Sequence, residues 1–268
     1  MGFGLDALVN HRLLEDRVCV VVGAASLRSI GYATAELFAL QGARIVTVDI
    51  AMDEPAADAV RASIEKVAQR PAEMFGAKCD IRSYTECRQL SRDVVSRYGT
   101  IDCLVNCAGI VKAQGMLEIE DVDYDRIMDA NLKGTFNICK SVLGVFAEKK
   151  RGVIVNVASV AAQRGGGLVG GAHYAASKGG VISLTRTIAR EFGPMGVRAN
   201  VICPSMTETG MLDGNVTAEQ FRDIVNAIPL RRAGRASDIA GACLFLASDL
   251  SAYVTGATID VNGGSHIH

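Results

Sequence analysis

The pentapeptide Tyr-Ala-Ala-Ser-Lys at residues 174–178 is the sharpest chemical signal in this 268-residue chain. On a helix, residues four apart share a face, so the ammonium of Lys178 would lie beside the phenol of Tyr174. A neighbouring positive charge favours the phenolate and lowers the pKa of the tyrosine. Such a tyrosine can exchange a proton with an alcohol or a carbonyl oxygen. Taken alone the spacing is weak, because it also fits a solvated tyrosine–lysine pair.

Two further polar residues fit the same chemistry. Ser159 ends a predicted strand fifteen positions before Tyr174, and its hydroxyl could hydrogen-bond the reacting oxygen. Asn131 lies within a long predicted helix, where asparagine is a poor helix former. Without further context, Asn131 also fits a polar residue on the surface.

Strand-like and helix-like segments alternate along the whole chain. The apolar, β-branched run 17–23 is typical of a strand covered on both faces, and helical spacing follows at 30–42. Repetition of this pattern predicts a single α/β domain of the Rossmann type, in which helices flank a doubly wound, seven-stranded parallel sheet. The expected strands are 17–23, 43–49, 72–80, 101–109, 152–159, 196–204 and 256–264, and the expected helices are 30–42, 54–69, 83–99, 122–150, 172–193, 218–228 and 237–248.

The ends of these strands predict where a ligand binds. In an open parallel sheet, ligands gather at the carboxyl ends of the strands, near the point where the strand order reverses. We expect residues 1–15 to be an N-terminal extension with a short surface helix, and residues 16–268 to be the catalytic domain. The residues at the strand ends are Gly23, Asp49, Asp80, Asn106, Ser159 and Pro204.

An ordered set of motifs resembles the short-chain dehydrogenase/reductase family over about residues 16 to 264. Two departures stand out: Cys107 replaces the second Asn of the family's Asn-Asn-Ala-Gly, and Ser205 replaces the glycine of its Pro-Gly motif. A set in this order, on these strand ends, is highly specific. Besides YAASK, the matching segments are NCAG at 106–109, NLKGTFN at 131–137, NVAS at 156–159, PSMTET at 204–209 and YVTGATIDVNGG at 253–264.

This resemblance implies a role for each member of a catalytic tetrad. Tyr174 would be the general acid/base, and Lys178 would lower its pKa and hydrogen-bond the nicotinamide ribose. Ser159 would hold the substrate oxygen, and Asn131 would anchor a water that links Lys178 to solvent. Hydride passes directly between the substrate carbon and the nicotinamide, so no metal is expected.

The glycine-rich turn departs most from the family. Of its glycines only Gly23 and Gly31 remain, and Leu-Arg-Ser at 27–29 stands where a single glycine is usual. Gly23 followed six positions later by Ser-Ile resembles the enoyl reductase branch of the same superfamily, although YAASK has the ordinary reductase spacing.

The altered turn is still expected to bind a phosphate. The helix from about residue 30 presents free N–H groups and the positive end of its dipole. The hydroxyls of Ser26 and Ser29 can add hydrogen bonds. Two positions of Arg28 remain open: it lies over the pyrophosphate or it is solvated.

Asp49 decides the expected coenzyme. A carboxylate at the end of the second strand accepts hydrogen bonds from the adenosine ribose and repels a 2′-phosphate, and Asp53 and Glu54 deepen the negative field. We therefore expect NAD rather than NADP, unless Arg28 reaches across. The residues expected to bind the coenzyme are Gly23, Ser26, Arg28, Ser29, Ile30, Asp49, Ile50, Asp80, Ile81, Asn106, Ala108, Gly109, Tyr174, Lys178, Pro204, Thr207 and Thr209.

Two segments are expected to shape the substrate pocket. Gln163 and Arg164 could meet an anionic or polyhydroxylated substrate, although Arg164 also fits a surface arginine. Residues of about 205–228 are expected to form a lid, in which Met206 and Met211 could cover an apolar substrate.

These features favour an NAD-dependent oxidoreductase that acts on a secondary alcohol, of the sugar, polyol or hydroxy acid type, or on its ketone. One alternative is a 3-oxoacyl thioester reductase, against which Asp49 weighs. An alternative of another class is a non-catalytic NAD-binding sensor, against which the complete tetrad weighs.

Composition narrows the partners to a small-molecule substrate. The net charge of -1 and the lack of a basic stripe argue against nucleic acid, and no apolar run approaches the roughly 18 residues of a membrane span. Eight cysteines without a CxxC pair favour a reducing cytoplasm. His266 and His268 make a poor metal site. The resemblance implies a homotetramer or homodimer, paired through the helices 122–150 and 172–193 and the C-terminal strand.

Overall fold

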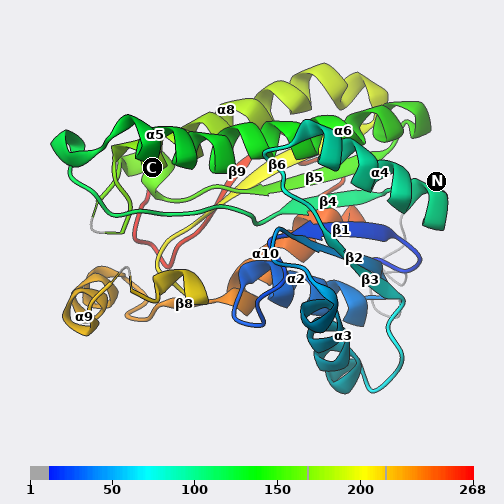
Figure 1. The fold of residues 1–268 in the computed structure, drawn as a ribbon, viewed down its shortest axis with the longest axis horizontal. Helices are drawn as coiled ribbons and strands as arrows, with labels where there is room; N and C mark the ends of the chain where they lie inside the picture. Colours follow the sequence, from blue (N-terminus) through cyan, green and yellow to red (C-terminus); the bar gives the residue numbers. More distant parts are fainter. Residues whose placement is uncertain (1–11, 168, 215) are drawn as a thin grey trace.

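Seven parallel strands form the central sheet, in the order β3-β2-β1-β4-β5-β6-β9 (Figure 1). The computed structural model describes residues 12–167, 169–214 and 216–268. The expected doubly wound, seven-stranded parallel sheet is therefore confirmed. Its strands are β1 (Val18–Val22), β2 (Arg44–Asp49), β3 (Met74–Lys78), β4 (Cys103–Asn106), β5 (Gly152–Val157), β6 (Val197–Pro204) and β9 (Thr258–Val261).

The register of these strands brings their carboxyl ends to one edge. Val22 of β1 pairs with Asn106 of β4, which in turn pairs with Asn156 of β5. All five side chains of β1 are buried, as expected for an apolar, β-branched strand that is covered on both faces. The chain leaves β1 toward β2 on one side and returns to β4 on the other, so the order reverses there and a crevice opens between the two strand ends.

Helices cover both faces of the sheet. Figure 1 shows α4, α5, α6 and α8 on one face and α2, α3 and α10 on the other. Phe38 and Ile64 pack in the core beneath the second group, and Ile138 and Phe146 pack beneath the first. The helices are α2 (Ile30–Leu40), α3 (Glu54–Ala68), α4 (Tyr84–Tyr98), α5 (Asp121–Met128), α6 (Gly134–Lys149), α7 (Ala161–Arg164), α8 (Ala172–Phe192), α9 (Ala218–Ala227) and α10 (Ala236–Ala247).

The N-terminal boundary differs from the expected one. Residues 1–11 of the expected extension, including its predicted surface helix, lie outside the described residues. Leu14 is fully buried in the core, and its amide donates to the carbonyl oxygen of Gln41 at 3.0 Å. The packed domain therefore includes residues before 16.

The expected helix 122–150 is interrupted by a π-helical turn. It divides into α5, the turn at Asp129–Lys133, and α6. Asn131 lies inside this turn and is fully buried, and the hydroxyl of Thr135 donates to its backbone oxygen at 2.6 Å. A wide turn of this kind is common at functional sites, and here it points an amide side chain into the interior.

The segment that follows β6 forms a separate small unit. Within it, β7 (Thr207–Glu208) pairs with β8 (Gly234–Arg235) in a two-stranded sheet. Figure 1 shows α9 at one end of the molecule, apart from both helical layers. Residues 205–214 and 216–228 are called the covering segment below. Its buried residue Met206 packs with Ile228 and Ala233 in a cluster of their own, against which Val169 also packs.

Candidate active site

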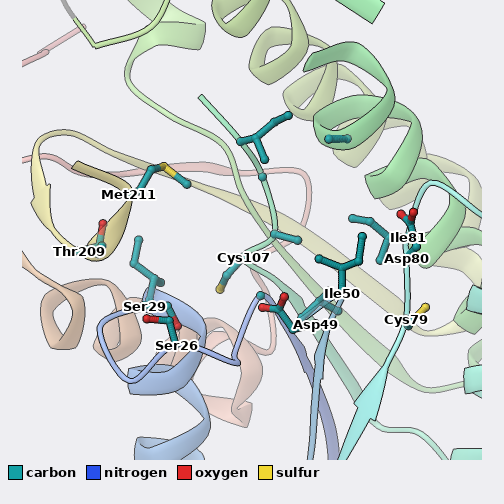
Figure 2. A pocket seen from close by; sticks show the side chains of 18 of the residues that line it. Ser26, Ser29, Asp49, Ile50, Cys79, Asp80, Ile81, Cys107, Thr209 and Met211 are labelled. Atoms are coloured by element: carbon teal, nitrogen blue, oxygen red, sulfur yellow. The ribbon is translucent and has the colours of Figure 1, made fainter. Parts of the chain in front are cut away.

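A cleft of about 500 Å³ opens at the carboxyl ends of β1, β2 and β4. In Figure 2, Asp80 and Ile81 lie at one end of this cleft, and Ser29, Thr209 and Met211 lie at the other. Of the residues expected to bind the coenzyme, those on its wall are Gly23, Ser26, Arg28, Ser29, Ile30, Asp49, Ile50, Asp80, Ile81, Ala108, Gly109 and Thr209.

The two glycines that the turn retains stand where no side chain fits. Gly23 has a φ of +84°, and a Cβ there would lie 2.8 Å from the amide nitrogen of Ala108. A Cβ on Gly31 would lie 2.2 Å from the carbonyl oxygen of Gly23. The turn therefore keeps its close backbone contacts, although it has lost the middle glycine and gained two residues.

The serines of the turn support its backbone. Ser29 caps α2, and its hydroxyl oxygen accepts from the amide of Tyr32 at 2.9 Å. The hydroxyl oxygen of Ser26 accepts from the amide of Arg28 at 3.2 Å. Both hydroxyls keep a proton to donate, and the first amides of α2 have no acceptor within the helix. These groups together suit an anionic phosphate.

Arg28 is exposed, but its charge is paired. Its guanidinium donates two hydrogen bonds to the carboxylate of Asp213, at 2.7 and 3.1 Å. This hydrogen bonding to Asp213 raises the pKa of Arg28 above its ordinary value. The pair joins the glycine-rich turn to the covering segment at the rim of the cleft.

Asp49 is held at the rim by two backbone amides. One carboxylate oxygen accepts from Ala25 at 3.2 Å, and the other accepts from Ala51 at 3.0 Å. A carboxylate has further lone pairs after two such bonds, so both oxygens can still accept from ribose hydroxyls. Ile50, which follows it, is exposed and lines the cleft.

Asp80 at the end of β3 is engaged by an arginine that the sequence did not single out. Arg82 donates from Nη2 at 2.6 Å and from Nε at 3.0 Å. Hydrogen bonding to Arg82 lowers the pKa of Asp80 below its ordinary value. A planar guanidinium and a carboxylate thus form the far end of the cleft.

Several residues on the wall were not anticipated, and most of them adjoin residues that were. Cys107 stands in the NCAG motif, and burial raises the pKa of its thiol to about 12, so it lines the cleft as an uncharged group. Arg126 of α5 is the exception, since no motif marks it. The unanticipated lining residues are Val22, Cys79, Arg82, Cys107, Ile110, Arg126, Ala130 and Gly210.

Asn131 is the centre of a buried hydrogen-bond network. Its Oδ1 accepts from the amide of Ile110 at 2.8 Å, and its Nδ2 donates to the carbonyl oxygen of Ile110 at 3.0 Å. The same Nδ2 donates to the hydroxyl of Ser177 at 3.0 Å, and Ser177 donates to the carbonyl oxygen of Tyr174 at 2.7 Å. The π-helical turn is thereby tied to both the end of β4 and the helix that carries Tyr174.

Lys178 lies next to this network. Its ammonium donates to the carbonyl oxygen of Val157 at 2.9 Å. A Cβ on Gly109 would lie 3.1 Å from the Lys178 nitrogen and 3.2 Å from Asn131 Oδ1, so the glycine leaves room for both. Burial lowers the pKa of Lys178 to about 8.

Tyr174 and Ser159 complete the group. Burial raises the pKa of Tyr174, and a hydrogen bond with Ser159 acts against this rise. The expected lowering of the Tyr174 pKa by Lys178 is not seen in this structure, where burial outweighs every other influence. Ser159 also accepts from the amide of Ala161 at 3.1 Å, which fixes its side chain at the start of α7. Tyr174 is therefore a protonated phenol at neutral pH.

Five residues expected to bind the coenzyme do not line this cleft: Tyr174 and Lys178, described above, and Asn106, Thr207 and Pro204. Asn106 is buried and donates to the hydroxyl of Thr135 at 2.9 Å. Thr207 donates to the carbonyl oxygen of Ser205 at 3.0 Å. Pro204 is buried at the end of β6.

The residues expected to meet the substrate are also engaged elsewhere. Gln163 donates to Asp260 at 2.8 Å, and Arg164 donates to the carbonyl oxygen of Ser265 at 3.3 Å. Met206 is buried in the cluster of the covering segment, whereas Met211 lines the cleft. The α7 turn therefore packs against the C-terminal part of the chain.

The described part of the chain has neither a metal-binding cluster nor a membrane-spanning helix. Within residues 12–167, 169–214 and 216–268, no three histidine, cysteine, aspartate or glutamate side chains gather closely enough to hold a metal ion. Among the helices of the same residues, none combines the length and apolarity that crossing a membrane requires.

Known proteins of one family match this chain over nearly its whole length. The family described as Enoyl-(Acyl carrier protein) reductase matches residues 23–266. An uncharacterized short-chain type dehydrogenase/reductase of Sinorhizobium fredii, y4mP, is 44% identical over 256 residues, which are 96% of this chain and 100% of that protein. The 3-oxoacyl-[acyl-carrier-protein] reductase FabG of Thermotoga maritima is 35% identical and covers 94% of this chain and 98% of its own. A solved levodione reductase superposes with a TM-score of 0.88 at 30% identity, over 94% of this chain and 98% of that chain.

Proposed function

Because this chain belongs to the short-chain dehydrogenase/reductase family, we propose that it interconverts a secondary alcohol and its ketone with NAD(H), and that Tyr174 is the general acid/base. Family membership itself implies an oxidoreductase that binds NAD(P); the choice of NAD(H) and of substrate is the proposal. The observation that carries the proposal is the convergence of Tyr174, Ser159, Lys178 and Asn131 beside a cleft whose other end presents Asp49.

In the reducing direction, Tyr174 donates its proton to the carbonyl oxygen of the substrate. Its raised pKa keeps this proton in place at neutral pH. Ser159 donates a hydrogen bond to the same oxygen and holds it within reach. The nicotinamide, when bound, supplies the hydride. In the oxidising direction each proton moves the opposite way.

Lys178 and Asn131 sustain the proton supply and the geometry. The Lys178 ammonium, already directed by Val157, can hydrogen-bond the nicotinamide ribose. Asn131 fixes the backbone at Ile110 through two hydrogen bonds. It would thereby anchor a water that links Lys178 to solvent. A proton lost by Tyr174 is then replaced along this route.

The residues present fit a dinucleotide, and they favour NAD(H) over NADP(H). Gly23 leaves no room for a side chain where the backbone bends under the cleft, and α2 begins beside it. The carboxylate of Asp49 would repel a 2′-phosphate. Arg28, the cation that could have offset this repulsion, is paired with Asp213.

The proposed substrate is a sugar, polyol or hydroxy acid, or the corresponding ketone. A second candidate, a 3-oxoacyl thioester, is favoured by the name of the reductase from Thermotoga maritima. The choice of NAD(H) weighs against it, because that biosynthetic reaction usually draws on NADPH. An acyl-carrier partner would also require a basic docking patch.

An absorbance assay at the NADH band tests these candidates. The protein is given NAD or NADP with a panel of secondary alcohols, and NADH or NADPH with the matching ketones and acetoacetyl-coenzyme A. We expect turnover with NAD(H) on members of the alcohol and ketone panel. A lower KM for NADP than for NAD, or exclusive turnover of the thioester, would overturn the corresponding part of the proposal. NADH binding without turnover on any substrate would favour a sensor.

The assembly is also proposed from the family, as a cytoplasmic homotetramer or homodimer. Among the described residues β9 pairs only with β6, so its outer edge is available to a second copy of the chain. Each of the eight cysteines is free, as suits a reducing compartment. Light scattering during size-exclusion chromatography would give a mass of four or two times 28.3 kDa.

A further inference from the structure

The glycine-rich turn, lengthened by two residues, carries a cation that reaches the covering segment at the rim of the cleft. Arg28 and Asp213 are 185 positions apart in the sequence, and their two parallel hydrogen bonds join the turn to the covering segment. The amide of Gly210 also donates to the carbonyl oxygen of Arg28 at 3.2 Å. These three hydrogen bonds are called the latch below.

The latch lies at the phosphate-binding end of the cleft. Arg28 and Gly210 both line it, together with Ser26. A Cβ on Gly210 would lie 4.0 Å from the hydroxyl oxygen of Ser26 and 4.0 Å from a carboxylate oxygen of Asp213. The covering segment therefore touches the turn where the helix α2 presents its free amides.

Other contacts among the described residues hold the covering segment at its base and within its own apolar cluster. Its base is held by the pairing of Thr207 with Gly234 in the small sheet. Its apolar residues pack mainly on one another and on Val169. The latch is the attachment that connects it to the coenzyme-binding turn.

We propose that Arg28 and Asp213 are positioning residues that keep the covering segment closed over the bound coenzyme and so slow its release. This inference rests on the proposed function. Both side chains are more than 60% exposed, which makes the pair easy to break and sensitive to salt. An easily broken closure suits an enzyme that must release its coenzyme in every catalytic cycle.

A direct role of Arg28 as a pyrophosphate ligand predicts a different result. If Arg28 acted by binding the pyrophosphate, Asp213 would compete with it, and removing the Asp213 charge would tighten coenzyme binding. If the latch acts by closing the segment, removing either charge loosens binding. The substitution Asp213→Asn therefore separates the two roles by the sign of its effect.

The experiment measures the dissociation of NADH by stopped-flow fluorescence, with excess NAD as the displacing ligand. It compares the wild type with Arg28→Gln, Asp213→Asn and the double variant. Each single substitution is expected to speed dissociation by about two- to fivefold, as for exposed ion pairs elsewhere. The double variant should be no faster than the faster single variant, because the two residues act as one unit.

Two controls sharpen the measurement. Asp16→Asn removes a carboxylate from another exposed ion pair, with Arg44 at 3.2 Å, away from the cleft, and should leave the rate unchanged. Asp213→Glu retains the charge and should behave more like the wild type than Asp213→Asn does. Raising the salt concentration should speed release from the wild type more than from Asp213→Asn.

Three outcomes would overturn the latch. They are slower NADH release from Asp213→Asn than from the wild type, additive effects in the double variant, and unchanged rates in all variants. A wild-type protein that binds no NADH would overturn the proposed function itself, and the latch with it. Because binding is measured without turnover, a wrong substrate assignment leaves this test intact.

Discussion

The two sides of the cleft are built in opposite ways. The side proposed to be catalytic, consisting of Asn131, Ser159, Tyr174 and Lys178, rests on strand ends and a buried hydrogen-bond network. The covering segment reaches the cleft through an exposed ion pair and a two-residue strand. Low local stability is typical of elements that open and close over a site. The difference teaches that the residues proposed for catalysis are held by buried contacts, whereas the segment that controls entry to the cleft is held by weak, exposed ones.

The largest effect is expected from the catalytic side. Tyr174→Phe removes the proton donor and should lower kcat by about 10²- to 10⁴-fold, while NADH binding survives. Steady-state assays and NADH fluorescence titration would measure the two quantities. Tyr98→Phe is a matched control, because the buried hydroxyl of Tyr98 has no hydrogen-bond partner among the described residues. Near-normal activity in Tyr174→Phe would contradict the assignment.

A smaller effect is expected at the far end of the cleft. Asp49→Asn removes a charge that should bind the adenosine ribose and repel a 2′-phosphate. We expect kcat/KM for NAD to fall by about tenfold or more, and the ratio for NADP over NAD to rise. Asp58→Asn, at an exposed position of α3, removes an equal charge outside the cleft and should change neither value. An unchanged coenzyme ratio in Asp49→Asn would show that this carboxylate does not select NAD.

The pH profile should reveal Lys178. Its pKa of about 8 means that the side chain is charged below that pH and neutral above it, whereas the raised pKa of Tyr174 keeps the phenol protonated across this range. The kcat/KM for ketone reduction should therefore be level near pH 7 and fall by about tenfold between pH 8 and pH 9.5, since each further unit of pH removes most of the remaining charged form. Alcohol oxidation uses the small phenolate fraction of Tyr174, which grows with each unit of pH below the pKa, so its rate should rise over the same interval. A reduction rate that rises with pH would contradict these roles.

The smallest effect is expected from the apolar packing of the covering segment. Phe221 is partly buried in the separate cluster, whereas Phe146 is fully buried under the sheet. Phe146→Ala should cost about 3–5 kcal/mol of global stability. Phe221→Ala should leave the global unfolding midpoint nearly unchanged and raise hydrogen exchange in the segment. Equal losses of stability in the two variants would show that the segment unfolds together with the domain.

The strand ends that line the cleft are a part of the site that the sequence predicts. Gly23, Asp49 and Asp80 lie at or just after the ends of β1, β2 and β3, and parallel strands bring such residues to one edge whatever the details of packing. The seven-stranded sheet follows from the same local patterns. Motif resemblance also predicts that Asn106 and Thr207 bind the coenzyme, and neither lines the cleft in this structure, because a matched motif does not show where a side chain points.

The remaining features depend on contacts between distant parts of the chain. The partner of Arg28 lies in a polar stretch with no motif, so nothing local marks Asp213. Gln163 and Asp260 meet 97 positions apart. The π-helical turn at Asn131 breaks a helix that residue propensities alone would continue, since its stability comes from hydrogen bonds to the end of β4.

The contact between Gly31 and the carbonyl oxygen of Gly23 has a consequence for protein engineering. The turn is closed by its two ends, so residues 24–28 form a cassette whose length and charge can change while the strand before it and the helix after it stay in place. In this chain the cassette holds two extra residues and an arginine. Exchanging cassettes between relatives would change how tightly the coenzyme is held and leave the proposed catalytic residues unaltered.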